Sequence, residues 1–245
     1  MKKAPVTFRR WEIDCLRGLA VGLMVVSNFL FDLFFFAGQT QLQSGALDWF
    51  ARFIAGFFIT LAGVTLTWSH SRSDSQAAGF GKYLRRGLNL LGLGLVISGV
   101  TWFAAGEQLV LFGVLHLIGA GIILAYPFMG RPWLSLVVGL LVLGAGPVVS
   151  QLRIGVPWFL WLGLQAQGFR SVDYAPLIPW FGFMLVGIFF GHLAYPGGEA
   201  RWQMVDYSSS VLGRILSWCG RRSLLVYFAH QPILLTGIVL FQKCH

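Results

Sequence analysis

Seven mainly apolar stretches, each of about 20 residues, follow one another along this chain of 245 residues. A helix of that length crosses the hydrocarbon core of a bilayer, which admits only helices and closed barrels. The predicted spans cover residues 12–36, 47–69, 83–104, 108–128, 132–151, 176–195 and 223–241. The sequence therefore predicts an all-α polytopic transmembrane bundle.

The composition supports the same class. Hydrophobic residues make up 56% of the chain and charged residues 11%, with a mean hydropathy of +0.72; soluble domains average roughly 25% charged residues. The 31 glycines suit helices that pack closely through small residues. We expect residues 1–245 to form a single transmembrane domain, in which residues 154–164 are a short interfacial or re-entrant segment.

The basic residues predict the orientation of the chain. With the N-terminus inside, 13 of the 18 Lys and Arg residues lie in cytoplasmic loops and 3 lie outside, while Arg17 and Arg52 lie within or at the ends of spans. This bias follows the positive-inside rule and places the N-terminus in the cytoplasm and the C-terminus outside. The same distribution argues against a nucleic-acid partner, despite the net charge of +9.

The last cytoplasmic loop, residues 196–222, carries apolar side chains at helical spacing with arginines nearby. One interpretation is an amphipathic helix on the inner leaflet. The other is a lid or cofactor-binding element at the cytoplasmic mouth of a polar pocket. The apolar residues concerned are Trp202, Val205, Val211, Leu212, Ile215, Leu216 and Trp218.

The first span carries Asp14 and Arg17 near one end and Asn28 and Asp32 near the other. An ionisable side chain in a span costs roughly 2.5–3.5 kcal/mol and is normally retained for a task. Asp14 and Arg17 are neighbours on one helical face. They form an ion pair at the inner interface, or Arg17 presents a fixed cation to an anionic ligand. Asn28 and Asp32 lie near the outer end. They position a hydroxyl or amine acceptor, or they only bond neighbouring helices.

The second span begins with Asp48 and Arg52, four residues apart, for which a surface ion pair is the default interpretation. Arg52 is followed by a long apolar run, so it needs a partner, and Asp32 at the same bilayer level is one candidate. We therefore predict one outer polar cluster of Asn28, Asp32, Asp48 and Arg52.

Later spans add further candidates. His116 in the fourth span is either a structural hydrogen-bond donor or a proton-transfer group. In the seventh span, His230 and Gln231 precede Pro232 and either satisfy the carbonyl that this proline frees or support the polar site. Asp173 precedes the sixth span and either caps a helix or contacts a substrate.

The remaining polar residues indicate no further chemistry. His70 and His192 receive no functional assignment, and the three cysteines predict neither a metal site nor a disulfide framework. We find no nucleophile elbow, phosphate-binding glycine loop or zinc signature in the sequence.

Four segments, in this order, resemble the bacterial heparan-α-glucosaminide N-acetyltransferase-like family of the transmembrane acyltransferase superfamily. They read WEIDCLRGLAVGLMVVSNFLFDL, FGVLHLIGAG, DYAPLIPWFGFMLVGIFFG and GRRSLLVYFAHQPIL. The resemblance implies an enzyme of the bacterial inner membrane. It would move an acetyl or other short acyl group from cytoplasmic acetyl-CoA, or another acyl-CoA, to an amine or hydroxyl of an extracytoplasmic glycan or lipid-linked sugar. Membrane lipid and the glycan acceptor would be its partners, with a homo-oligomer as a further option.

The chain departs from this superfamily at one position. The usual catalytic signature there is an arginine followed eleven residues later by a histidine; Arg17 matches it, but Asn28 stands in the place of the histidine. An amide cannot act as a general base. Either His116 or Asp32 takes the proton, with His230 in support, or the usual transfer is altered. Arg17, Arg221 and Arg222 are the residues expected to bind the phosphates of the donor.

Two other classes of function stay open on the sequence alone. A transporter or flippase would use the same polar pocket without covalent chemistry, although no inverted repeat is visible. A structural partner subunit would need none of these polar residues for activity.

Overall fold

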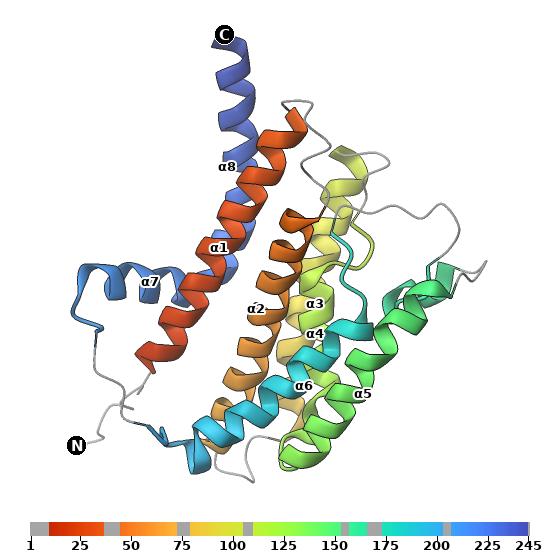
Figure 1. Ribbon diagram of the computed structural model, residues 1–245, viewed down its shortest axis with the longest axis vertical. Helices are drawn as coiled ribbons and strands as arrows, with labels where there is room; N and C mark the ends of the chain where they lie inside the picture. Colours follow the sequence, from red (N-terminus) through yellow and green to blue (C-terminus); the bar gives the residue numbers. More distant parts are fainter. Residues whose placement is uncertain are drawn as a thin grey trace. The chain divides into compact units, whose positions relative to one another are not determined.

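The computed structural model describes residues 10–36, 45–72, 79–104, 110–152, 157–165, 173–202 and 207–244. These residues form α-helices and a few short 3-10 helices (Figure 1). The helices are α1 (Trp11–Phe36), α2 (Ala46–Ser71), α3 (Phe80–Ala104), α4 (Val114–Leu124), α5 (Pro132–Gln151), α6 (Leu177–Ala194), α7 (Val211–Arg221) and α8 (Ser223–Cys244). The prediction of an all-α membrane bundle is confirmed.

The helices differ in whether they are long enough to cross a membrane. Within the described ranges, α1, α2, α3, α5 and α6 are long and apolar enough to cross a membrane, whereas α4 and the apolar part of α8 are shorter. The predicted span 108–128 shrinks to α4 because Gly113 before it is extended (φ −94°, ψ −174°) and Pro127 after it lies in a 3-10 turn. Residues 108 and 109 lie outside the described residues. The predicted count of seven is therefore approximate.

Two other predictions fall partly outside the described residues. Of the predicted segment 154–164, residues 154–156 are not described, and Pro157–Leu162 form a 3-10 helix (η4) that is too short to span a bilayer. The exposed ring of Trp158 on η4 suits an interfacial position. Five of the basic residues used to predict the orientation also lie outside: Lys2, Lys3, Arg9, Arg153 and Arg170.

The contacts divide the chain into two compact units. The first comprises Met1–Phe58 and Met204–His245, and so contains α1, the first half of α2, α7 and α8. The second comprises Ile59–Gln203, with the second half of α2 and α3 to α6.

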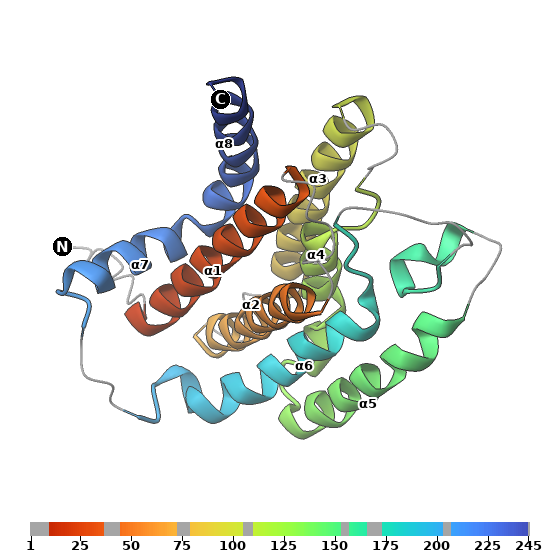
Figure 2. The same cartoon turned by 45° about the horizontal axis from the view of Figure 1, so that its top comes forward.

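In the first unit, α7 lies across the N-terminal half of α1, and α8 runs beside α1 (Figures 1 and 2). The crossing requires small residues. A Cβ atom on Gly18 of α1 would overlap the carbonyl oxygen of Leu216, and one on Gly220 of α7 would overlap the carbonyl oxygen of Asp14. The thiol of Cys15 also donates a hydrogen bond to the carbonyl of Gly213 at 3.4 Å. The backbones of α1 and α7 are therefore in direct contact.

The helix α7 corrects the extent of the predicted amphipathic helix. Its N-terminus is capped by Ser210, whose hydroxyl accepts the N–H of Gly213 at 3.0 Å. Trp202 lies before this cap and is not helical, and Val205 lies outside the described residues. The apolar spacing in the sequence extends upstream of residue 211. The helix nevertheless begins at Val211, because the hydroxyl of Ser210 accepts an N–H group that the first turn leaves free.

In the second unit, α6 buries Met184, Leu185 and Ile188 completely. It lies against both α2 and α5. Glycines allow the close approach to α2: a Cβ atom on Gly63 would overlap the carbonyl oxygen of Met184, and one on Gly187 would overlap that of Thr60. The glycine-rich composition thus serves helix packing, as small residues do in membrane bundles.

Two glycines of α1 allow a matched test of this packing. We expect Gly18→Ala to lower stability by about 1–3 kcal/mol, because the new methyl group would force α1 and α7 apart. Gly22→Ala on the same helix meets no atom within 4 Å. It should leave stability unchanged or raise it by about 0.5–1 kcal/mol through helix propensity. Thermal unfolding of both purified variants in detergent measures the difference. Equal unfolding temperatures would contradict the tight crossing.

Candidate active site

A histidine of α8 reaches the asparagine of α1 inside the first unit. The side-chain nitrogen Nδ2 of Asn28 lies 2.7 Å from Nε2 of His230, although 202 residues separate them in the chain. The other ring nitrogen, Nδ1 of His230, lies 2.6 Å from the carbonyl oxygen of Tyr227. His230 is buried and Asn28 is half-buried. An imidazole therefore stands next to the amide that replaces the expected histidine.

The two hydrogen bonds assign the tautomer of His230. A carbonyl oxygen only accepts, so Nδ1 must carry the proton and donate it to Tyr227. In the neutral ring, Nε2 then holds a lone pair and accepts the N–H of Asn28. A ring held by a backbone carbonyl in this way has its basic nitrogen directed at a fixed point.

A second polar pair lies beside the first. The amide of Gln231 donates to both carboxylate oxygens of Asp32, at 3.1 and 3.3 Å. Asp32 is buried at 6% exposure, so its carboxylate would otherwise be unpaired within the protein. Because Asn28 and Asp32 are one turn apart on α1, and their partners are adjacent on α8, the two bonds together fix one register between these helices.

The structure brings together two of the four residues predicted to form an outer polar cluster. Asn28 and Asp32 meet His230 and Gln231, whereas Asp48 and Arg52 are exposed on α2. No hydrogen bond or ion pair joins either of them to Asp32 within the described residues. The sequence predicted Asp48 and Arg52 as the neighbours of Asn28 and Asp32. In the structure, His230 and Gln231 of α8 take this place.

Residues near the other end of α1 lie where α7 crosses it. Asp14 is buried and Arg17 is half-buried, one turn apart, and the carbonyl of Asp14 contacts Gly220 of α7. Arg221 and Arg222 are exposed at the C-terminal end of α7. The three predicted donor-binding arginines therefore occur in the same compact unit.

His116 lies in the second unit and holds the N-terminus of α4. Its Nδ1 accepts the backbone N–H of Gly113 at 3.3 Å, and Oδ2 of Asp173 accepts that of Val114 at the same distance. Both groups pair N–H donors that the first turn of a helix leaves free, and a carboxylate is favourable at this end. The helix-capping interpretation of Asp173 therefore holds for α4, rather than for α6, which follows Asp173 in the chain.

The same contacts leave His116 poorly placed to take a proton. Its lone pair on Nδ1 is engaged, so the proton sits on Nε2, which has no hydrogen-bond partner among the described residues. The ring is 5% exposed and packs between Phe112 and Gly94. A methyl group on Gly94 would lie 2.8 Å from the ring, so no substrate atom fits on that side.

The two residues after Asp173 also fix this loop through hydrogen bonds. The hydroxyl of Tyr174 donates to the carbonyl oxygen of Leu160 at 2.7 Å, and burial raises the pKa of this phenol to about 12. The N–H of Ala175 donates to the carbonyl of Phe112 at 2.9 Å. The first bond closes the predicted outer loop on its own η4 segment, and the second attaches it to the start of α4. Both favour the structural interpretation of the loop over a substrate contact.

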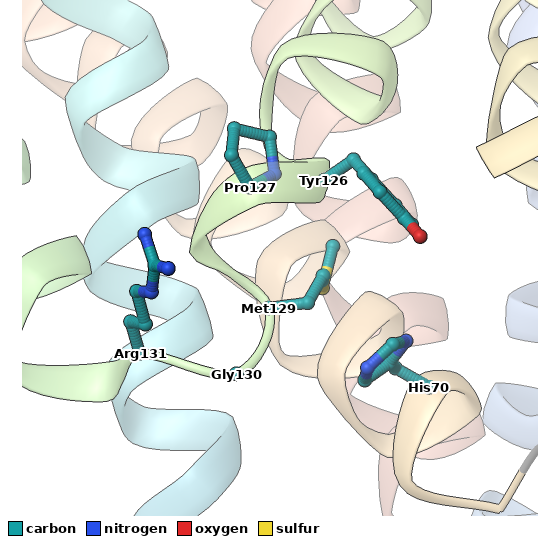
Figure 3. Close-up of a pocket in the computed structure, with 6 residues that line it drawn as sticks. All are labelled: His70, Tyr126, Pro127, Met129, Gly130 and Arg131. Atoms are coloured by element: carbon teal, nitrogen blue, oxygen red, sulfur yellow. The ribbon is translucent and has the colours of Figure 1, made fainter. Parts of the chain in front are cut away.

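A separate polar pocket of about 330 Å³ lies at the end of α2 and the connection between α4 and α5. Figure 3 shows His70 and Tyr126 on one side of Met129 and the guanidinium of Arg131 on the other. The imidazole of His70 is held by the hydroxyl of Tyr83 at 2.7 Å. None of the residues predicted to be functional lines this pocket.

The family comparison covers nearly all of the elements described above. The family model described as heparan-alpha-glucosaminide N-acetyltransferase, catalytic, matches residues 9–232. The chain belongs to this family. The match includes α1 and the part of α8 that carries His230 and Gln231. No curated protein and no solved structure gives a significant match to the chain.

Family membership and the apolar helices together define the general class. The protein is an integral membrane protein with the domain of a transmembrane acetyltransferase, a family whose members use acetyl-CoA. The sequence analysis of this family member named all four residues that bond between α1 and α8, namely Asn28, Asp32, His230 and Gln231. It missed the direct pairing of His230 with Asn28, because nothing local in either helix indicates a partner so distant in the chain.

Substitutions of His116 separate a capping role from a catalytic role. We expect His116→Ala to destabilise the protein by about 0.5–2 kcal/mol, because the N–H of Gly113 loses its acceptor. His116→Gln keeps an acceptor of the kind found in capping boxes, and it should retain most of the stability and of the acetyl-transfer rate. Thermal unfolding and acetyl-CoA turnover measure both effects. A stable His116→Gln protein without transfer activity would instead identify His116 as the base.

Proposed function

We propose that this protein transfers an acetyl or other short acyl group from cytoplasmic acetyl-CoA, or another acyl-CoA, to a sugar outside the cytoplasm, with His230 as the general base. The acceptor is an amine or hydroxyl of a glycan or lipid-linked sugar, and the amine of a terminal α-glucosaminide fits the description of the family. The observation that carries this proposal is the bond of 2.7 Å between Nε2 of His230 and Nδ2 of Asn28.

The base argument rests on position and tautomer. On the first span, the superfamily signature places an imidazole where this chain has Asn28, and α8 supplies an imidazole at hydrogen-bond distance from that point. The carbonyl of Tyr227 holds the proton on Nδ1, so Nε2 is the nitrogen with a free electron pair. Imidazole is the side chain best suited to proton transfer near neutral pH. Asp32 is the weaker candidate, since Gln231 occupies both of its oxygens.

In the proposed reaction, the acceptor displaces the amide of Asn28 from His230. Its nitrogen or oxygen attacks the thioester carbonyl while Nε2 takes its proton. The tetrahedral intermediate then expels the thiolate of coenzyme A, which receives that proton from the imidazolium. The products are the acetylated acceptor and free coenzyme A, and His230 returns to its neutral state.

The neighbours of His230 have distinct proposed roles. The released N–H of Asn28 is a donor for the oxyanion of the intermediate, a type of contact worth about 3–4 kcal/mol in other enzymes. Asp32 and Gln231 are positioning residues, because their bond keeps α8 in register with α1. Arg17 is proposed to contact the phosphates of the donor with its guanidinium. Asp14, one turn before it, orients α1 at its crossing with α7.

The remaining parts of the proposal concern location. The N-terminus lies in the cytoplasm and the C-terminus outside, in a bacterial inner membrane, as the distribution of basic residues favours. The two compact units act as one catalytic domain surrounded by membrane lipid. A homo-oligomer is compatible with this proposal but not required by it.

The decisive experiment compares two histidine variants in purified protein reconstituted in nanodiscs. We expect His230→Gln to lower thiol release from acetyl-CoA, with an α-glucosaminide as acceptor, by about 10²–10⁴-fold. Binding of acetyl-CoA, measured by calorimetry, should be unchanged. His192→Gln is the matched control, since His192 also bonds a carbonyl of its own helix, that of Ile188 at 3.0 Å. It should leave both quantities unchanged.

A double variant tests the site itself. Asn28→His combined with His230→Gln returns an imidazole to the same point and should recover part of the lost rate. An unaltered rate in His230→Gln would remove His230 as the base while leaving the transferase intact. Absence of acetyl-CoA binding in the parent protein would overturn the proposed reaction. Accumulation of the α-glucosaminide in vesicles without any acyl donor would support a transporter instead.

A further inference from the structure

The helix α7 has an apolar face that the described residues of its own unit leave exposed. Its small residues Gly213, Ser217 and Gly220 are buried, and they lie on the side that packs against α1. At 100° per residue, Val211, Ile215 and Trp218 fall on the opposite side, where they are 74%, 55% and 45% exposed. The helix therefore has one face for α1 and another for its surroundings.

The direction of α7 places that face at a membrane surface. In Figures 1 and 2, α7 lies across α1 and turns at its end into α8. α1 is long and apolar enough to cross a membrane, so a helix that lies across it runs along the membrane plane. An amphipathic helix in that position inserts its apolar face at the boundary between headgroups and acyl chains.

The exposed polar side chains of α7 are all basic. Arg214 and Arg221 are exposed two turns apart on one side of the helix, and Arg222 is its C-cap. The guanidinium of Arg222 lies over the indole of Trp218, 5.0 Å from the ring centroid. Stacking holds the plane of the guanidinium while its N–H groups stay available for a phosphate, and indole rings favour the headgroup level.

From this arrangement we propose that α7 is a docking surface for anionic lipid headgroups, which Arg214, Arg221 and Arg222 bind while Val211, Ile215 and Trp218 insert among the acyl chains. Each basic residue near an anionic leaflet strengthens the electrostatic attraction to the headgroups. The proposal does not depend on the acetyltransferase chemistry. It assigns Arg221 and Arg222 to lipid phosphates rather than to the acyl donor.

Two other occupants fit the surface less well. The phosphates of an acyl donor would engage the arginines but leave the apolar face exposed. A second copy of the chain would cover the apolar face, but α7 has 11 residues, about 16 Å in length. Such a strip is far smaller than the ~800 Å² per partner of a stable interface. An anionic lipid meets both requirements, because its headgroup pairs with the arginines and its acyl chains cover the apolar face.

The test measures contact between Trp218 and lipid in the full-length protein. The protein is reconstituted in phosphatidylcholine nanodiscs in which a minority lipid carries brominated acyl chains that quench tryptophan fluorescence. The signal of Trp218 is the difference between the parent protein and Trp218→Phe. At equal mole fraction, brominated phosphatidylglycerol should quench this signal at least about 2-fold more than brominated phosphatidylcholine, because it is enriched around α7.

The arginine variants supply the decisive comparison. Replacing Arg214, Arg221 and Arg222 together by Gln should reduce quenching by phosphatidylglycerol to the phosphatidylcholine level. Arg201→Gln is the matched control, since Arg201 also lies over an indole, that of Trp202 at 5.7 Å, but not on α7. It should leave the Trp218 signal unchanged. Unaltered unfolding temperatures of all variants verify the fold.

Three outcomes would overturn the proposal. Equal quenching by both brominated lipids in the parent protein would exclude a preference for anionic headgroups. Absence of quenching by either lipid would mean that protein covers α7, as in a dimer of this chain. Relief of quenching by added acetyl-CoA would assign the arginines to the acyl donor instead.

Discussion

The arrangement of α1 and α8 depends on the rule that polar groups inside a bilayer are paired within the protein. Asn28 and Asp32 lie on a helix that is long and apolar enough to cross a membrane, and His230 and Gln231 supply their partners. Interhelical bonds of this kind are worth on average about 0.6 kcal/mol, so they add little stability. Their effect is on register, because sliding α8 by one residue would break both pairs at once.

The same face of α1 carries two kinds of contact. Asp14 and Asp32 are 18 residues apart, which is five whole turns at 3.6 residues per turn, so they point in the same direction. Gly18 falls on this face too and admits the backbone of α7. The N-terminal half of α1 is thus positioned by close backbone packing against α7, and its C-terminal half by side-chain hydrogen bonds to α8. Because α7 leads directly into α8, each contact limits the freedom of the other.

Much of the fold and part of the site follow from the sequence. Apolar length and the excess of glycine predict the class, and the high free energy of polar side chains within a membrane span singles out Asn28, Asp32 and His230. The sequence around His116 does not reveal its role. A lone imidazole in an apolar helix gives the same sequence pattern whether it caps the helix or transfers a proton. Only the position of Gly113, Gly94 and Asp173 around it decides between these roles.

The separation of Asn28 and His230 by 202 residues has a consequence for biosynthesis. At 5–20 residues per second, α1 emerges from the ribosome about 10–40 s before α8. During that interval the carboxylate of Asp32 and the amide of Asn28 lack their final partners. The nascent first helix must therefore wait near the insertion machinery, pair transiently with other polar groups, or keep its hydrophilic end hydrated. A chain interrupted before α8 would hold neither pair, so the cluster assembles only after α8 has been synthesised.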